Sequence, residues 1–249
     1  PIHWAVLIQR VRRLIEQSRL YKQLLESQEK NETLLLNILP KPIAKRLQEG
    51  ESRIADRFDN VSVLFADIVG FTSLATRISP EQLIDTLNCI FSKFDRLTEH
   101  YKLEKIKTLG DGYMVASGLP IPSNDCADPI VKMAIAMQAA TIKLNQRMKF
   151  PLALRIGIHT GSAIAGVIGI KKFTYDLWGD TVNIASRMEQ HGIPHCIQIT
   201  EATYRQLSDR YGFEERETID VKGKGKMKTY LLDCSESKDS IAQLQAASF

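Results

Sequence analysis

The 249-residue chain has few cysteines, and none of them are paired at the spacing of a metal or redox motif. The four residues are Cys89, Cys126, Cys196 and Cys234. Their scatter, without a CxxC pair, is typical of free thiols in a reducing compartment and argues against a disulfide-stabilised secreted domain. The histidines and cysteine of HGIPHC, at 191–196, do not have zinc-ligand spacing, so we expect an ordinary loop there.

The sequence also lacks an apolar run of the roughly 18 residues that a membrane helix needs. The apolar stretch WAVLI at 4–8 is short and is followed closely by Arg10, Arg12 and Arg13. Because the chain begins at Pro1 instead of methionine, we expect it to be part of a longer protein with an upstream sensor or a membrane anchor. We predict a cytoplasmic location for residues 1–249 themselves.

A strong excess of one charge is missing as well. The net charge is +4, which can help to hold a small polyanion but does not indicate a nucleic-acid surface. Hydrophobic residues make up 44% of the chain and charged residues 25%, as in ordinary globular proteins. The length suffices for one core of about 150–200 residues and an appendage.

The appendage is predicted at residues 1–50, where a heptad pattern runs along the chain. Ten positions step by 3 and 4 residues, and seven of them are apolar. They are Leu7, Val11, Leu14, Ser18, Tyr21, Leu25, Gln28, Glu32, Leu35 and Leu39. A period of about 3.5 predicts a left-handed coiled coil between two copies. The alternative is one amphipathic helix packed on its own domain. Pro40 and Pro42 should end this helix, with a short helix after them and a polar linker at 51–57.

The globular domain is predicted at 58–235, followed by a tail at 236–249. Apolar spacing predicts helices at 80–100, 126–148 and 181–190. It predicts strands at 61–67, 103–108, 112–117, 152–159, 162–168, 196–199 and 229–232. The order βαββαβ indicates an α+β, ferredoxin-like fold, with an antiparallel sheet and helices on one face.

Two aspartates follow strands of this sheet. Asp67 closes the first strand, and Asp111 lies in the tip of the hairpin that contains Gly110 and Gly112. If the first strand lies beside the hairpin, both carboxylates meet at one sheet end and suit Mg²⁺ together with phosphates. Each aspartate, taken alone, is equally consistent with a turn cap. Residues 70–72 should open a short helix whose free N–H groups can bind phosphate oxygens.

Five motifs occur in an order that resembles the class III nucleotidyl cyclase domain, covering about 58–233. They are FADIVGFT (65–72), KIKTLGDGYM (105–114), LRIGIHTG (154–161), GVIGIKKFTYDLWGDTVNIASRME (166–189) and VKGKG (221–225). The preceding LLLNILPKPIAKRL (34–47) is similar to the helix and joint that often precede this domain. One departure is Asp180, where many family members have Asn; we expect it to cap the helix.

The resemblance implies a role for each matching position. Asp67, Ile68 and Asp111 match metal-binding positions for two divalent ions, Mg²⁺ or Mn²⁺. Lys107 and Asp176 match the pair that reads the base; adenylyl cyclases have Lys and Asp there, and guanylyl cyclases usually have Glu and Cys. Asn183 and Arg187 match the residues that position the ribose and stabilise the transition state. Other substrate-binding matches are Phe65, Gly70, Phe71, Thr72, Arg155 and Lys222.

The resemblance therefore implies an adenylate cyclase that converts ATP to 3′,5′-cyclic AMP and pyrophosphate. The expected chemistry is two-metal-assisted, in-line attack of the ribose 3′-OH on the α-phosphate. Since one cyclase domain carries the whole residue set, we predict a homodimer with sites shared between two chains, held by the cyclase domain and the N-terminal helix. A catalytically dead, nucleotide-sensing or purely dimerising module and a guanylate cyclase are the alternatives.

Overall fold

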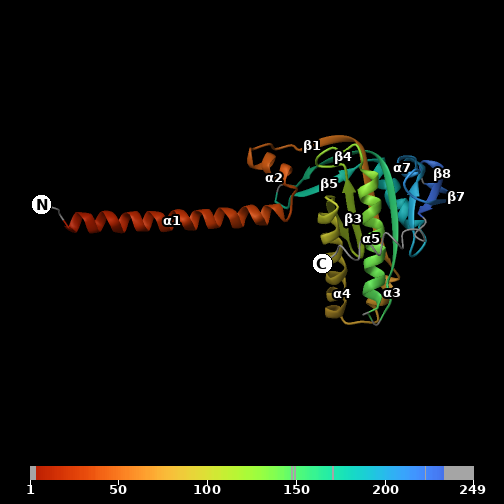
Figure 1. Cartoon of the computed structure of the whole chain (residues 1–249), viewed down its shortest axis with the longest axis horizontal. Coiled ribbons are helices and arrows are strands. Elements are labelled where there is room, and N and C mark those ends of the chain that lie inside the picture. Colours follow the sequence, from red (N-terminus) through yellow and green to blue (C-terminus); the bar gives the residue numbers. More distant parts are fainter. Residues whose placement is uncertain (1–3, 147, 149, 170, 222, 233–249) are drawn as a thin grey trace. The chain divides into compact units, whose positions relative to one another are not determined.

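The computed structural model describes residues 4–146, 148, 150–169, 171–221 and 223–232 (Figure 1). The described residues fall into two compact units. The first unit consists of the described residues within Pro1–Ile54 and Gly169–Thr174. The second unit consists of the described residues within Ala55–Ile168 and Tyr175–Phe249. Among the described residues, no helix combines the length and apolar character needed to cross a bilayer. The predicted tail at 236–249 lies outside the described residues.

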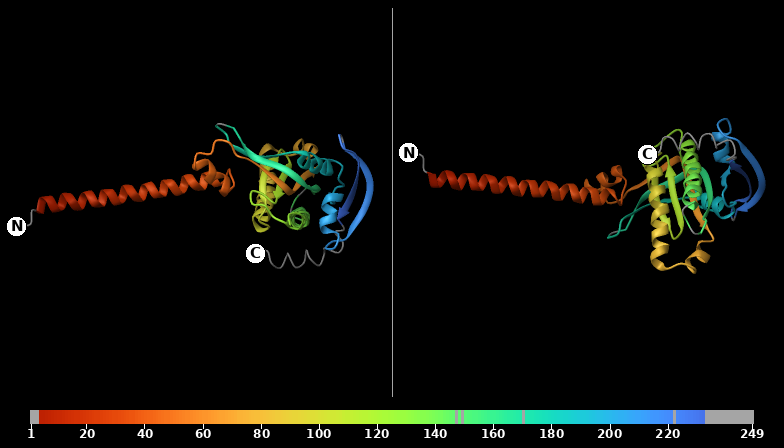
Figure 2. Two further views of the ribbon diagram at one scale, coloured as in Figure 1. Left: turned by 90° about the horizontal axis from the view of Figure 1, so that it is seen from above. Right: turned by 60° about the horizontal axis from the view of Figure 1, so that its bottom comes forward.

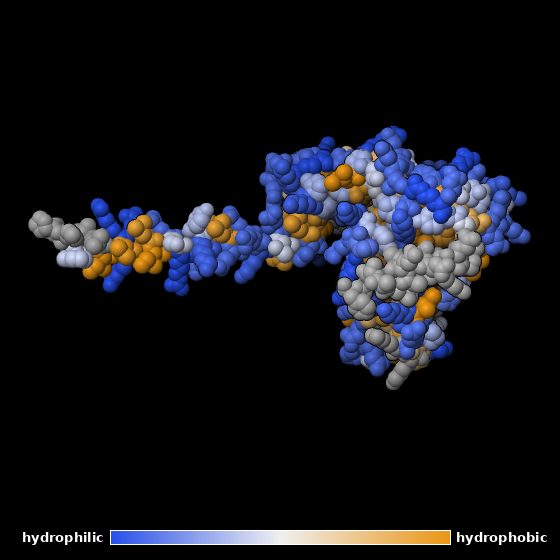
Figure 3. All heavy atoms as spheres, viewed as in Figure 1, coloured by the Kyte–Doolittle hydropathy of each residue, from blue (hydrophilic) through white to orange (hydrophobic). Residues whose placement is uncertain are grey.

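The first unit contains a long helix, α1 (Trp4–Leu36), and a short one, α2 (Lys41–Gln48). Many of the described apolar side chains of α1 are exposed, for example Leu14 and Tyr21, each 64% accessible, and Figure 3 shows apolar groups along this helix. The helix ends before Leu39, which is buried and therefore is not part of the seam. The predicted coiled coil needs a second chain and stays a prediction.

The second unit is built on one sheet with strand order β2-β3-β1-β4-β6-β8-β7, in which β5 also pairs with β4. The strands are β1 (Ala55–Val69), β2 (Glu104–Leu109), β3 (Gly112–Ser117), β4 (Ala153–Ile168), β5 (Thr174–Trp178), β6 (Ile197–Thr200), β7 (Phe213–Val221) and β8 (Gly225–Leu232). The helices are α3 (Phe71–Ala75), α4 (Pro80–His100), α5 (Ala127–Asn145), α6 (Asp180–Gln190) and α7 (Glu201–Leu207).

The first four strands have the ferredoxin-like arrangement, which confirms the predicted fold class. Chain order β1-α4-β2-β3-α5-β4 gives the spatial order β2-β3-β1-β4. The two helices of this core, α4 and α5, lie side by side along one face of the sheet (Figure 2). The expected antiparallel pairing holds for β1 with β3 and β4, whereas β4 and β6 are parallel.

The main differences from the predicted elements concern strand length. Instead of two strands at 152–159 and 162–168, β4 is continuous, because it pairs with an equally long β1 from Ala55 to Val69. The first residues of β1 thus lie within the predicted linker at 51–57. The elements β5, α7 and β7 were not predicted, since their short or mostly exposed segments show little periodicity in the sequence.

The two faces of the sheet are covered by different helices. Ile156 and Ile158 of β4 belong to the main core, together with Phe94 of α4 and Met133 of α5. Between them, Gly157 points to the opposite face, where α6 packs. The prediction that helices cover one face therefore holds for the ferredoxin-like core but not for α6. This second layer brings α6 next to the carboxyl end of β1.

Candidate active site

The carboxyl end of β1 carries Asp67 at the centre of the sheet. Asp67 is opposite Arg155 in the β1–β4 ladder, and the preceding Ala66 is opposite Tyr113 of β3. At Gly70 the backbone is left-handed, with φ of 75°, so the chain turns sharply from the strand into α3, which begins at Phe71. The predicted short helix after Asp67 is therefore present, and Phe71 also packs against the core.

Asp111 lies beside Asp67, as expected from pairing of β1 with the β2–β3 hairpin. Burial raises the pKa of Asp67 to about 6, and the negative charges of Asp111 and Glu189 add to this effect. The Arg155 guanidinium opposes the rise in this pKa, while a hydrogen bond with Asp111 favours the protonated form of Asp67. The raised pKa of Asp67 is therefore chiefly an effect of burial, to which the two neighbouring carboxylates add and which Arg155 only partly offsets.

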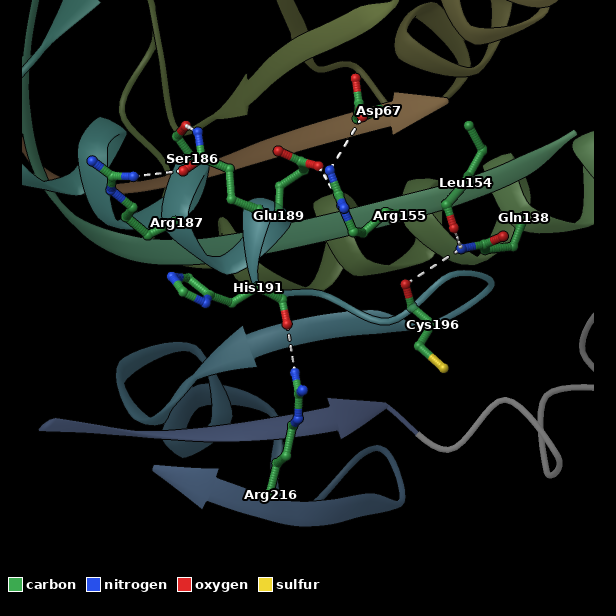
Figure 4. Close-up of polar contacts among 11 residues, drawn as sticks. Asp67, Gln138, Leu154, Arg155, Ser186, Arg187, Glu189, His191, Cys196 and Arg216 are labelled. Atoms are coloured by element: carbon green, nitrogen blue, oxygen red, sulfur yellow. Dashed lines mark hydrogen bonds and ion pairs between the residues drawn. The ribbon is translucent and has the colours of Figure 1, made fainter. Parts of the chain in front are cut away.

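Arg155 links this carboxylate to α6. Its Nη2 atom is 3.3 Å from Asp67 Oδ2, and its Nε atom donates to Glu189 Oε1 at 2.7 Å (Figure 4). Glu189 is buried, and its pKa is raised, chiefly by this burial. Sequence reasoning missed Glu189, although it is the last residue of the motif quoted from 166 to 189. Its place in the predicted helix and its acidic side chain were the available signals.

The residues matched to base reading gather on one face of the sheet. Met114 is opposite both Phe65 of β1 and Lys107 of β2, so these three side chains point to the same face. Lys107 Nζ is 2.5 Å from Asp176 Oδ2 of β5. The second Asp176 oxygen accepts a hydrogen bond from the backbone N–H of Leu177, which fixes the carboxylate. A cationic donor and an acceptor are thus held side by side near Phe65.

Asn183 and Arg187 lie one turn apart on α6 and line a cavity of about 400 Å³. The other lining residues are Asp180, Ile184, Ser186, Gln190, Val221, Gly223 and Lys224. Arg187 donates to Gln190 at 2.6 Å and extends away from Asp67 in Figure 4. Within one chain, Arg187 and Asp67 therefore point in different directions (Figure 4).

Asp180 and Lys222 were both predicted to act near this cavity. Asp180 does not cap α6, because Gly179 occupies the cap position and the Asp180 side chain accepts from Lys224 at 2.7 Å instead. Lys222, predicted to contact phosphate, lies outside the described residues. Its neighbours Gly223 and Lys224 line the cavity, so the β7–β8 turn reaches α6.

A divalent cation fits the carboxylates at the end of β1. The described residues contain no cluster of three or more His, Cys, Asp or Glu side chains suited to a metal ion. The pair Asp67 and Asp111 still suits Mg²⁺, which binds one or two carboxylates together with substrate phosphates. Asp111 and Glu189 place negative charge next to the partly buried Asp67, and a cation bound there would stabilise the ionised form of Asp67.

Comparison with known proteins identifies the family of this chain. The family model "Adenylate and Guanylate cyclase catalytic domain" matches residues 54–234. An adenylate cyclase of Mycobacterium bovis is 45% identical over 205 residues, which cover 82% of this chain and 46% of the relative. The human guanylate cyclase soluble subunit beta-2 is 43% identical over 216 residues, which cover 86% of this chain and 35% of the relative. The chain thus spans less than half the length of these curated relatives.

Solved structures of both kinds of cyclase are similar to this chain. The adenylyl cyclase CyaB from P. aeruginosa has a TM-score of 0.68 at 30% identity, covering 72% of this chain and 95% of that one. The catalytic core of a rhodopsin-guanylyl cyclase with converted specificity, in complex with ATPαS, has a TM-score of 0.67 at 34% identity. The match covers 72% of this chain and 97% of that one. With the motifs and the ferredoxin-like core, these matches show that the chain belongs to the family of adenylate and guanylate cyclase catalytic domains.

Proposed function

We propose that this chain is an adenylate cyclase that converts ATP to 3′,5′-cyclic AMP and pyrophosphate. The family match leaves the nucleotide open, because adenylate and guanylate cyclases are similar to the chain at nearly the same identity. The observation that carries the choice of ATP is the Lys107–Asp176 pair, held at 2.5 Å near Phe65.

The chemistry of this pair is complementary to adenine. Adenine presents an acceptor at N1 and a donor at its N6 amino group, which suit a lysine donor and an aspartate acceptor. Guanine presents the reverse pattern, so its O6 would face the Asp176 carboxylate, acceptor against acceptor. The backbone N–H of Leu177 keeps one Asp176 oxygen occupied, so the other oxygen is directed at Lys107 or the base.

The active site is proposed to form between two chains. Asp67 lies at the end of β1 with Asp111 of the β2–β3 turn beside it, whereas Arg187 extends away from Asp67 and lines its own cavity (Figure 4). A two-fold dimer would bring the α6 cavity of one chain over the carboxylates of the other and would create two equivalent sites. The exposed apolar residues of α1 would hold the two copies together as a coiled coil.

Each matched residue then has a role in joining the 3′-oxygen to the α-phosphorus and releasing pyrophosphate. Asn183 positions the ribose, and Arg187 stabilises negative charge on the reacting phosphate. Arg155, Lys222 and the backbone of residues 70–72 hold the triphosphate. Two divalent ions, Mg²⁺ or Mn²⁺, held at Asp67, Ile68 and Asp111, would activate the attacking hydroxyl and offset charge on the leaving group. The protein mainly supplies position and charge.

The test is an assay of the purified chain with ATP and with GTP, in Mg²⁺ and in Mn²⁺, over a range of protein concentrations. We expect cyclic AMP as the main product and specific activity that rises with concentration. Preferential formation of cyclic GMP would make the chain a guanylate cyclase. Nucleotide binding without turnover under every condition would make it a nucleotide-sensing module.

A further inference from the structure

The contacts of Arg155 are unequal. Its Nε atom donates to Glu189 at 2.7 Å, a good charge-assisted hydrogen bond, whereas its Nη2 contact with Asp67 is long, at 3.3 Å. The Glu189 side chain is 10% exposed, and those of Arg155 and Asp67 are 27% and 29% exposed. The arginine is therefore held firmly on its Glu189 side and loosely on its Asp67 side.

The position of Glu189 is itself set by backbone packing. The Glu189 amide and the preceding Met188 carbonyl carbon lie against Gly157. Any residue other than glycine at position 157 would place its Cβ atom on these backbone atoms. Met188 is also fully buried. Because the backbone around Glu189 cannot shift easily, the base of its side chain is fixed, and its buried carboxylate accepts from Arg155 Nε at 2.7 Å.

We propose that Glu189 is a positioning residue, which holds Arg155 beside Asp67 and keeps it from occupying the carboxylate pair completely. A divalent cation at Asp67 and Asp111 would repel the guanidinium, and the long Asp67 contact would be lost before the Glu189 contact. Arg155 would then stay at the rim of the metal site with its outer N–H groups directed at an anion. The part that concerns the triphosphate rests on the proposed function.

The affinity for a cation should therefore depend on both Glu189 and Arg155. Without Glu189, the whole charge of Arg155 would pair with Asp67 and compete with the cation. Without Arg155, this competition disappears, and removing Glu189 should then change the cation affinity much less. The effects of the two residues on cation binding are therefore coupled, which a double-mutant cycle can measure.

The experiment is a titration of the nucleotide-free protein with Mn²⁺, in which the free ion is followed by electron paramagnetic resonance. Asp67 and Asp111 belong to one chain, so the affinity can be measured in any oligomeric state. We expect Glu189→Gln to weaken Mn²⁺ binding about fivefold and Arg155→Met to strengthen it by a similar factor. The double variant should bind Mn²⁺ like Arg155→Met alone.

The matched control is Glu201→Gln, which removes the same charge from an exposed ion pair with Arg205. It should leave Mn²⁺ affinity unchanged. If Glu189→Gln does not fold, Glu189→Asp keeps the charge but withdraws it from Arg155, and should give a smaller loss of affinity. An unchanged affinity in a folded Glu189 variant, or an equal loss with and without Arg155, would overturn the proposal.

A second measurement addresses the substrate. With ATP, Glu189→Gln should raise KM about tenfold and lower kcat much less, because Arg155 is misplaced while the reacting groups remain. An equal loss of kcat with KM unchanged would contradict the positioning role. The Mn²⁺ titration contains no nucleotide, so it tests the Glu189–Arg155 coupling even if ATP proves not to be the substrate.

Discussion

Gly157 lies directly against the backbone of Glu189: a Cβ atom at Gly157 would be 1.9 Å from the Glu189 amide nitrogen. This close approach lets α6 lie flat on β4, although the two residues are 32 positions apart in sequence. As a result, the Glu189 carboxylate reaches Arg155, which is opposite Asp67 on the neighbouring strand. One glycine thus connects the second helical layer to the carboxylates of the candidate site.

The first prediction concerns this contact. Gly157→Ala should lower the free energy of unfolding by about 2 kcal/mol or more, because the clash is with backbone atoms. Gly161→Ala is the comparison, since its Cβ would meet the Thr181 hydroxyl at 2.7 Å, a side-chain atom that can move at the cost of its hydrogen bond to the Ser162 carbonyl. Urea unfolding of both variants gives the two values. A smaller loss for Gly157→Ala than for Gly161→Ala would contradict the packing described.

The second prediction concerns the carboxylates. Asp67→Ala or Asp111→Ala should abolish turnover while the fold stays intact, because either change removes one of the two proposed carboxylate ligands. Cyclic nucleotide formation is measured with saturating Mg²⁺ and with Mn²⁺, and circular dichroism checks the fold. Near-normal turnover in either variant would exclude this pair as the metal site.

The third prediction concerns the shared site. Asp67→Ala and Arg187→Ala chains should each be inactive, because each loses one half of both sites in a homodimer. After mixing and subunit exchange, heterodimers carry both lesions in one site and leave the other site intact, so part of the activity should return. Labelled chains verify the exchange by fluorescence transfer. If exchange occurs without recovery, the site lies within one chain.

The fourth prediction concerns the choice of base. Lys107→Glu combined with Asp176→Cys should shift kcat/KM from ATP toward GTP, since the new carboxylate accepts from guanine and the opposing acceptor is removed. Each mismatched polar group costs about 1–3 kcal/mol, so two changes should alter the ratio about 100-fold or more. Total activity should fall, because the surrounding pocket is unchanged. A double variant that keeps the full ATP preference would show that other residues read the base.

The fifth prediction concerns pH. Burial lowers the pKa of His159 from 6.5 to about 4, and the nearby charges of Asp180 and Lys224 act on it in opposite directions. A depressed histidine pKa contributes stability that is present above pH 6.5 and is lost as the pH falls toward 4. Over this window the loss should reach about 3 kcal/mol.

The measurement is urea unfolding of the wild type and of His159→Gln at several values between about pH 4.5 and 7.5, which span most of this window. The free energy of unfolding should fall less steeply with decreasing pH in the variant, which has no imidazole to protonate after unfolding. His191→Gln alters an exposed histidine and serves as the control. Parallel pH profiles of the wild type and His159→Gln would show that His159 is not the responsible group.

The sequence by itself determined the fold class and most of the matched site positions. The continuous apolar run Val63–Ala66 before Asp67 predicted the central strand, and the βαββαβ order put that strand beside the hairpin of Asp111. Helical spacing put Asn183 and Arg187 on one face of α6, where both line the same cavity. These features follow from local periodicity and element order, which a single sequence contains.

Only the tertiary structure decided which polar groups meet between layers. It made β4 one long strand because β1 is equally long, and it put α6 on the face opposite α4 and α5. Glu189 therefore contacts Arg155, and Asp180 contacts Lys224 instead of capping its helix. Such contacts depend on how closely two backbones approach across the sheet. That distance is set by packing at Gly157, and no periodic pattern along the chain encodes it.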